Sequence, residues 1–205
     1  MKAVFARDVA EAGACANKCI ALANEHGFPF WAGFGLIVQG WVAAHSGDPT
    51  AGIACIREGL AQAEATGSHV FDPHHLTLLA EALALAGKVD EGLSVLDEGF
   101  ASSAASGQKG WDAELHRLRG ELVQQLPRPD PARAEASFRT ALAITREQGT
   151  RGYELRAATS LARLWGEHGR REEARDLLAP VYGWFTEGFD TADLQEAGVL
   201  LEALT

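Results

Sequence analysis

The side chains in this sequence best suited to binding a metal lie near its start. Cys15 and Cys19 are one helical turn apart, and His26 follows on the same predicted helix. Thiolate and imidazole ligands suit zinc, but a structural zinc site needs four ligands and this set offers three. In an alanine-rich helix a free cysteine also packs as a small apolar residue. We therefore expect Cys15, Cys19 and Cys55 to be reduced core residues, and we predict no metal site.

A second group with metal-binding chemistry is Asp72, His74 and His75, which crowd one predicted loop. Their carboxylate and imidazole groups could serve as ligands. The alternative is structural, because Asp is a frequent N-cap and Pro, here Pro73, is frequent at the first helical position. We favour the second interpretation, in which Asp72 caps a helix.

Motifs for catalysis and nucleotide binding fail at specific positions. A phosphate-binding loop ending at Lys88 would need glycine at position 82 and Ser or Thr after the lysine, where the sequence has Ala82 and Val89. A dinucleotide-like pattern begins at residues 33–35, but Val38 stands where its third glycine belongs. The sequence contains no HExxH, GxSxG or EF-hand motif. We predict no catalytic residue and no cofactor, so the chain is not expected to be an enzyme.

Composition indicates a cytoplasmic protein without a nucleic-acid or membrane partner. The chain has 205 residues, 47% of them apolar, and a formal net charge of −10, which opposes binding to nucleic acid or anionic membrane. Charged residues at Arg7, Asp8 and Glu11 interrupt any signal-peptide core. No apolar stretch approaches the 18 residues that a membrane span requires.

The elements that position these side chains are most clearly defined in residues 149–189. Apolar residues at helical spacing predict one amphipathic helix, Gly169 ends it, and a second amphipathic helix follows. The apolar positions are Leu155, Ala158, Leu161, Ala162 and Trp165 in the first helix and Ala174, Leu177, Leu178 and Val181 in the second. One such pair cannot bury its apolar face alone, so we predict a solenoid of stacked copies.

The copies repeat with a period of about 40 residues. Glycines that end the second helix of each pair lie at Gly27, Gly67, Gly107 and Gly149, which are 40, 40 and 42 residues apart. Small residues recur where the two helices approach closely, at Gly40, Ala80, Gly120 and Ala162 in the first helix and at Ala12, Gly52, Gly92, Ala134 and Ala174 in the second. The prolines in residues 126–134 replace one tight turn and account for the longer spacing.

We predict an all-α, right-handed superhelical solenoid of antiparallel helix pairs. A single domain, 1–205, would consist of a half repeat (1–27), four full repeats (28–67, 68–107, 108–149 and 150–189) and a capping helix (190–205). The ten helices are expected at 5–25, 30–45, 49–66, 73–86, 90–105, 111–125, 131–147, 152–167, 171–186 and 191–204, with Asp190 or Thr191 capping the last.

The small residues and turn glycines of these pairs resemble tetratricopeptide repeats. The runs GFPFWAGFGLIVQGW (27–41), AELHRLRGELV (113–123), ELRAATSLARLW (154–165) and GRREEARDLLAPVYGWFTEGFDTADLQEA (169–197) resemble the C-terminal repeat region of bacterial adenylate or guanylate cyclase-linked signalling ATPases. Related ATPase-type transcriptional activators have similar regions. The resemblance implies a role in signal transduction, and none of that family's catalytic residues has a counterpart in this sequence.

The predicted binding surface is the concave groove lined by the first helix of each pair. Its exposed side chains are expected to be Phe34, Ile37, Trp41, His74, Thr77, Glu81, Glu114, Arg117, Glu121, Arg156, Thr159 and Arg163. An apolar end, an acidic stretch and an arginine-bearing end would suit a peptide or partner helix. In the alternative, the apolar residues pack on the incomplete first repeat and the arginines pair with Glu154, Glu167 and Glu172.

The sequence therefore predicts a non-catalytic protein-interaction or sensor module that binds a protein or peptide. Two other hypotheses stay open. A small-molecule effector could fill a pocket near Trp41, or the half repeat at the start could dock on another copy and form a homodimer.

Overall fold

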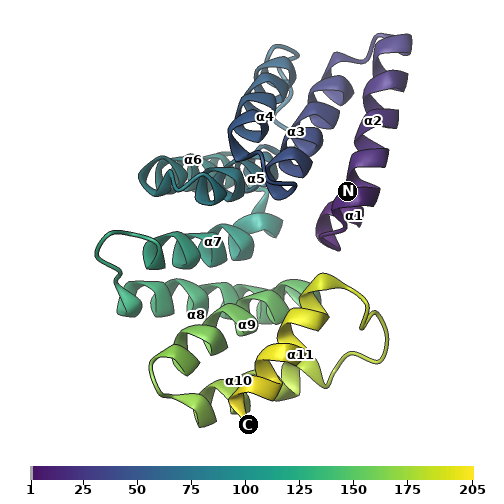
Figure 1. Ribbon diagram of the computed structural model, residues 1–205. Coiled ribbons are helices and arrows are strands. Elements are labelled where there is room, and N and C mark those ends of the chain that lie inside the picture. The colour runs from purple at the N-terminus through teal and green to yellow at the C-terminus, as the bar shows by residue number, and fades with distance from the viewer. Residues whose placement is uncertain (1) are drawn as a thin grey trace. The chain divides into compact units, whose positions relative to one another are not determined.

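The computed structural model describes residues 2–205, and every regular element in that range is helical (Figure 1). Each of the ten predicted helices has a counterpart, and one helical turn and one 3₁₀ segment are added. The helices are α1 (Lys2–Phe5), α2 (Val9–His26), α3 (Pro29–His45), α4 (Pro49–Glu64), α5 (Asp72–Leu85), α6 (Val89–Ser106), η1 (Lys109–Trp111), α7 (Asp112–Gln124), α8 (Pro131–Gln148), α9 (Arg151–Glu167), α10 (Arg171–Tyr182) and α11 (Ala192–Leu204). Within residues 2–205, no helix combines the length and hydropathy needed to cross a bilayer.

Glycines mark the helix ends as the sequence pattern predicts, and three aspartates that the pattern did not identify cap second helices. The predicted glycines after second helices and in the turns between paired helices all have positive φ, for example 70° at Gly27 and 68° at Gly149. Asp8, Asp48 and Asp130 cap the second helices by accepting hydrogen bonds from the backbone N–H three residues later, at 2.9, 2.9 and 3.0 Å. These local signals fix where each helix pair turns.

The first predicted helix, 5–25, is wrong at its start. Arg7 adopts a left-handed conformation (φ 55°), so the chain breaks between α1 and α2. Forty residues later Gly47 has a positive φ of 103° at the end of α3. The single turn α1 therefore corresponds to the last turn of a first helix, and the opening segment is not limited to a second helix.

Two smaller predictions also need correction. Asp72 is the first residue of α5 and not its N-cap, which is Phe71 in a left-handed conformation (φ 69°). The helix expected at 171–186 ends at Tyr182, because Pro180 removes a backbone donor inside its last turn and Gly183 follows.

Internal contacts divide the chain into two compact units, Met1–Lys109 and Gly110–Thr205. The boundary follows Gly107, where the sequence predicts that the second full repeat ends. The prediction that both units form one domain stays a prediction.

The closest packing within the first unit joins α3 to α4, and glycines make it possible. A Cβ placed on Gly40 would lie 2.6 Å from the carbonyl oxygen of Gly52, and one on Gly33 would lie 2.7 Å from that of Gly59. The predicted close approach at Gly40 and Gly52 is therefore confirmed, and a second glycine pair extends it by two helical turns.

Candidate functional site

The apolar end of the predicted groove is not exposed. Phe34, Ile37 and Trp41 are 8%, 0% and 1% accessible. The Cγ1 atom of Ile37 lies 2.8 Å from where a Cβ of Gly59 would be, so this side chain faces the glycine seam between α3 and α4. Helical periodicity identifies an apolar stripe but not the neighbour that covers it, and here the covering elements are other helices of the same unit.

Trp41 instead links two successive first helices. Its indole Nε1–H donates a 2.6 Å hydrogen bond to Oε2 of Glu81, from α3 to α5. The ring of His45 lies 4.2 Å from the Trp41 ring, and its Nε2 is 3.8 Å from the same carboxylate oxygen. The predicted groove residues Trp41 and Glu81 are thus brought together, in a contact between repeats.

The predicted groove residues His74 and Thr77 on α5 are buried as well. Next to them, His75 packs against the rings of Phe34 and Phe71, with centroids 5.5 and 6.3 Å away, and neither of its ring nitrogens has a hydrogen bond. Burial lowers the pKa of His75 to about 4, against a smaller opposing effect of Asp72. His75 is therefore neutral at pH 7.

No metal site is formed by the groups that suggested one. Among the described residues, no cluster of three or more His, Cys, Asp or Glu side chains is arranged to hold an ion. Asp72 Oδ2 lies 2.8 Å from Nδ1 of His69, outside the proposed set. Cys15 is exposed and Cys19 and Cys55 are half-buried, so the expectation that Cys15 is a core residue is wrong.

In the second unit three predicted groove residues, Glu114, Arg117 and Arg156, form a charged ladder with Asp193 across α7, α9 and α11. Arg117 makes a two-pronged ion pair with Glu114 on α7, at 3.0 and 2.7 Å. Arg156 on α9 donates to Glu114 at 3.4 Å and to Asp193 on α11 at 2.8 Å. We call Glu114, Arg117, Arg156 and Asp193 the charged ladder. Glu114 is buried, so its predicted exposure is wrong.

Further contacts extend the charged ladder along the helices. Ser160 on α9 donates a 2.6 Å hydrogen bond to Glu121 on α7, and Arg163 pairs with Glu196 on α11. The predicted groove residue Thr159 is buried and donates to its own helix, to the carbonyl oxygen of Leu155 at 2.8 Å. The Arg163–Glu196 pair is the more open one, with side chains 37% and 39% accessible, against 12% and 16% for Arg156 and Asp193.

Of the alternative partners predicted for these arginines, Glu154 is wrong. Glu154 pairs with Arg146 and Arg151, at 2.9 and 2.6 Å, and not with Arg156 or Arg163. Burial works to raise the pKa of Glu154, but hydrogen bonds from those two arginines lower it overall. For Arg156, burial works to lower the pKa, and the carboxylates of Glu114 and Asp193 raise it overall. The pairing follows the stacking of repeats, which sequence spacing within one repeat does not reveal.

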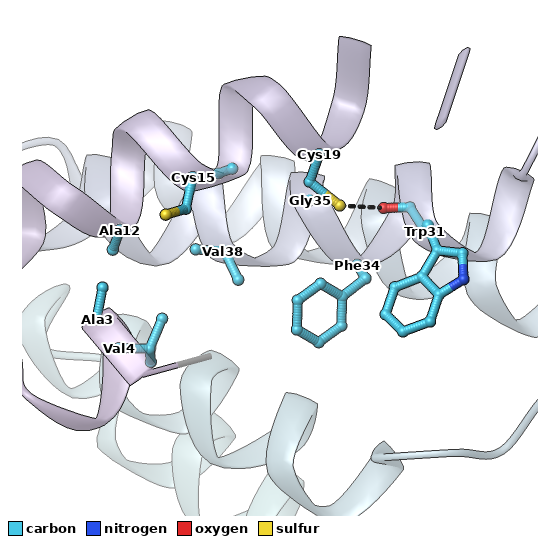
Figure 2. A pocket seen from close by; sticks show the side chains of 10 residues that line it. Ala3, Val4, Ala12, Cys15, Cys19, Trp31, Phe34, Gly35 and Val38 are labelled. Atoms are coloured by element: carbon cyan, nitrogen blue, oxygen red, sulfur yellow. Dashed lines mark hydrogen bonds between the residues drawn. The ribbon is translucent and has the colours of Figure 1, made fainter. Parts of the chain in front are cut away.

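A cavity of about 170 Å³ lies in the first unit, beside α1, α2 and α3 (Figure 2). Sequence reasoning placed a pocket near Trp41 and missed this one. Small and aromatic side chains line it: Ala3, Val4, Ala12, Cys15, Ala16, Cys19, Trp31, Phe34, Gly35 and Val38. The Cys19 thiol donates to the Trp31 carbonyl oxygen at 3.3 Å, and burial raises the pKa of this thiol. A usable signal was the alanine at position 16, where the next repeat has Ile56.

Comparison with known proteins supports the repeat fold. The chain is similar to the crystal structure of BtubC (BKLC) from P. vanneervenii, with a TM-score of 0.73 and 18% identity over 96% of this chain and 83% of that one. It is also similar to a putative kinesin light chain of Podosopora anserina with nearly identical TPR-like repeats, with a TM-score of 0.57 and 17% identity over 85% and 86% of the two chains. The fold is therefore a tetratricopeptide-like helical solenoid.

Sequence comparison gives a more limited result. No protein-family model matches the chain. An uncharacterized protein of Rhizobium meliloti (strain 1021) is 31% identical over 142 residues, which cover 69% of this chain. The chain spans only 14% of the length of that relative.

Proposed function

We propose that this chain is a protein-interaction module that binds a peptide or partner domain along its first helices. Tetratricopeptide-like folds are generally interaction scaffolds, and the observation that carries the proposal here is the partly exposed Arg163–Glu196 pair. An exposed ion pair contributes less than about 1 kcal/mol, so a partner's carboxylate can replace Glu196 on Arg163 at little cost. The buried Arg156 has no such freedom and holds α7, α9 and α11 together.

This distinction divides the proposed contact residues. Arg163 and Glu121 contact the partner directly. The buried residues of the predicted set, including Ile37, Trp41 and Glu114, act by positioning the helices. The module has a binding role and no chemistry of its own.

The experiment compares two charge reversals on neighbouring helices. Arg163→Glu lies in the proposed contact surface, and Arg175→Glu lies on α10 at a half-exposed position outside it. Affinity capture with the intact chain identifies partners, and titration calorimetry then measures both variants. We expect Arg163→Glu to weaken binding about tenfold or more and Arg175→Glu to leave it unchanged, because interfacial charge pairs are local. Equal binding by both variants would remove Arg163 from the contact surface.

We also propose that the module belongs to a bacterial, cytoplasmic signalling protein of the cyclase-linked ATPase type. The resemblance of residues 169–197 to such proteins and the similarity to a much longer bacterial relative support this assignment. The reading frame upstream of residue 1 tests it. A cyclase or ATPase segment there supports a sensor region, and an unrelated frame contradicts it.

Homodimerisation through the first repeat is a second candidate, favoured by three large exposed apolar side chains on α2, on α3 and in the turn between them. Leu22, Phe28 and Trp31 are 57%, 55% and 47% accessible. Large exposed apolar side chains can contribute to an association surface. Light scattering coupled to size exclusion decides the matter, because a strict monomer at high concentration excludes a homodimer.

A further inference from the structure

Three charged side chains on α7, α9 and α11 are more open to solvent than the charged ladder on the same helices. Glu121 on α7, Arg163 on α9 and Glu196 on α11 are 27%, 37% and 39% accessible. In the charged ladder the side chains of Arg156 and Asp193 are only 12% and 16% accessible. We call Glu121, Arg163 and Glu196 the outer charges. Their accessibility allows a partner to contact them.

The outer charges are neighbours across α7, α9 and α11 of the second unit (Figure 1). Glu121 accepts a 2.6 Å hydrogen bond from Ser160, which lies one helical turn before Arg163 on the same face of α9. Arg163 in turn pairs directly with Glu196. Glu121 and Arg163 are also 42 residues apart, which is the period of the repeat at this point. One partner segment that crosses the three helices therefore meets all three outer charges.

The order of the outer charges, which is negative, positive and negative, restricts the partner. Nucleic acid or a uniformly acidic peptide meets repulsion at Glu121 and Glu196, and a uniformly basic peptide meets it at Arg163. A segment with basic, acidic and basic side chains in that order forms an attractive pair at each position. Since complementary charges set specificity and like charges exclude wrong partners, the outer charges select this alternating pattern.

The spacing of the helices selects the conformation of that segment. Helices in contact lie about 8–10 Å apart, so the outer charges recur at about that interval. A polyproline II segment has three residues per turn and rises about 3.1 Å per residue, so every third side chain lies on one face, about 9 Å from the last. In a β-strand the side chains on one face recur about every 7 Å instead. The polyproline II conformation is therefore the better match.

We propose that the outer charges bind a polyproline II segment of a partner protein in which a basic, an acidic and a basic residue follow each other at every third position. The acidic residue takes the place of Glu196 on Arg163, and the two basic residues pair with Glu121 and Glu196. This inference rests on the proposed interaction role and adds the chemistry of the partner. Because the order of charges is symmetric, it holds for either chain direction of the segment.

The test compares two labelled, end-capped heptapeptides on the intact chain by fluorescence anisotropy at low salt. Lys-Pro-Ala-Glu-Pro-Ala-Lys carries the proposed order of charges, and Glu-Pro-Ala-Lys-Pro-Ala-Glu inverts every charge at the same spacing. We expect the first peptide to bind about tenfold more tightly, because three attractive pairs replace three repulsive ones and each exposed pair contributes a small share. Raising the salt to about 1 M should remove most of the difference, since it screens exposed charges.

Two matched charge swaps locate the site. Arg163→Glu combined with Glu196→Arg keeps an ion pair between α9 and α11 but exchanges its ends, so it should reverse the preference between the two peptides. Arg175→Asp combined with Asp176→Arg exchanges a pair on α10, outside the outer charges, and should leave the preference unchanged. Circular dichroism checks that both variants fold. If the first swap does not fold, Arg163→Met takes its place and should reduce the preference.

Three outcomes would overturn the proposal. The first is that Lys-Pro-Ala-Glu-Pro-Ala-Lys does not bind saturably or binds no better than the inverted peptide. The second is an unchanged preference in the folded variant at Arg163. The third is tighter binding of a helical peptide of about 15 residues with the same charges seven residues apart, which also advances about 10 Å per charge.

The same measurements separate this proposal from the interaction role itself. If captured partners lose affinity on Arg163→Glu while the two heptapeptides bind equally, the interaction role stands and the order of charges is wrong. If captured partners bind the Arg163→Glu variant as they bind the wild type, the proposed contact surface is wrong.

Discussion

The two units hold their successive helices together by different physical means. In the first unit, glycines at Gly33, Gly40, Gly52 and Gly59 let α3 and α4 approach until their backbones touch. In the second, the charged ladder joins α7, α9 and α11 through Arg156. Close packing tolerates no added atoms, whereas a buried ion network tolerates no missing charge. The same fold therefore has a different vulnerability in each unit.

The largest effect is expected from adding a side chain to the glycine seam. Gly40→Val would place atoms within 2.6 Å of the Gly52 carbonyl oxygen, and backbone cannot yield as a flexible side chain can. We expect a loss of about 4 kcal/mol or more, beyond the usual cost of about 1–3 kcal/mol for overpacking, because the clash is with backbone. Urea unfolding followed by circular dichroism measures it. Gly152→Val, at an α9 position with no neighbour within 4 Å, is the control and should change stability little.

Removing the central charge of the ladder should have the next largest effect. Arg156→Met leaves Glu114 and Asp193 with fewer compensating charges, and breaking a buried pair in this way costs about 3–4 kcal/mol. Arg163→Met is the same substitution at a more exposed ion pair, and it should lower the free energy of unfolding by less than about 1 kcal/mol. Similar losses for both variants in urea unfolding would mean that burial does not distinguish the two pairs.

A pH-dependent effect is expected in the first unit. The folded-state pKa of His75, about 4, is below its ordinary 6.5, so the unfolded chain binds more protons between these values. The contribution of neutral His75 to the free energy of unfolding is therefore fully present above pH 6.5. About 3 kcal/mol of it is lost as the pH falls toward 4. His75→Phe keeps a ring beside Phe34 and Phe71 and should flatten this part of the stability profile. Parallel pH profiles for wild type and variant would contradict the prediction.

The smallest effect concerns the polar link of the first unit. Glu81→Gln keeps the length of the side chain that accepts the hydrogen bond from Trp41 but removes its charge. A neutral hydrogen bond is weaker than a charge-assisted one, so we expect a loss of about 1 kcal/mol. Thermal unfolding of this variant beside Glu98→Gln, an exposed change on α6, measures the difference.

The sequence predicts the helix pairs well because their ends depend on local chemistry. Gly27 and Gly149 act within one turn of their own helix, so spacing alone locates them. The break at Arg7 was missed because a non-glycine residue gives no signal for a left-handed conformation. Local signals thus define the elements but not every interruption.

The candidate site was harder to predict because it depends on contacts about 40 residues apart. Ile37 and Trp41 lie on one helix face that their register places in an exposed groove. Other helices of their unit nevertheless cover both side chains. The partners of Arg156 lie 42 and 37 residues away, so its pairing depends on how repeats stack. The cavity is lined in part by Ala16, which stands where the next repeat has Ile56.

Arg156 also affects how the second unit loses structure. Its guanidinium group donates hydrogen bonds to carboxylates on α7 and α11, so α11 cannot detach without leaving Arg156 short of a partner. Fraying of α11 therefore also destabilises α9 and, through Glu114, α7. Three helices that are separate in sequence share one opening event, and their backbone amides should exchange with solvent as a single cooperative block.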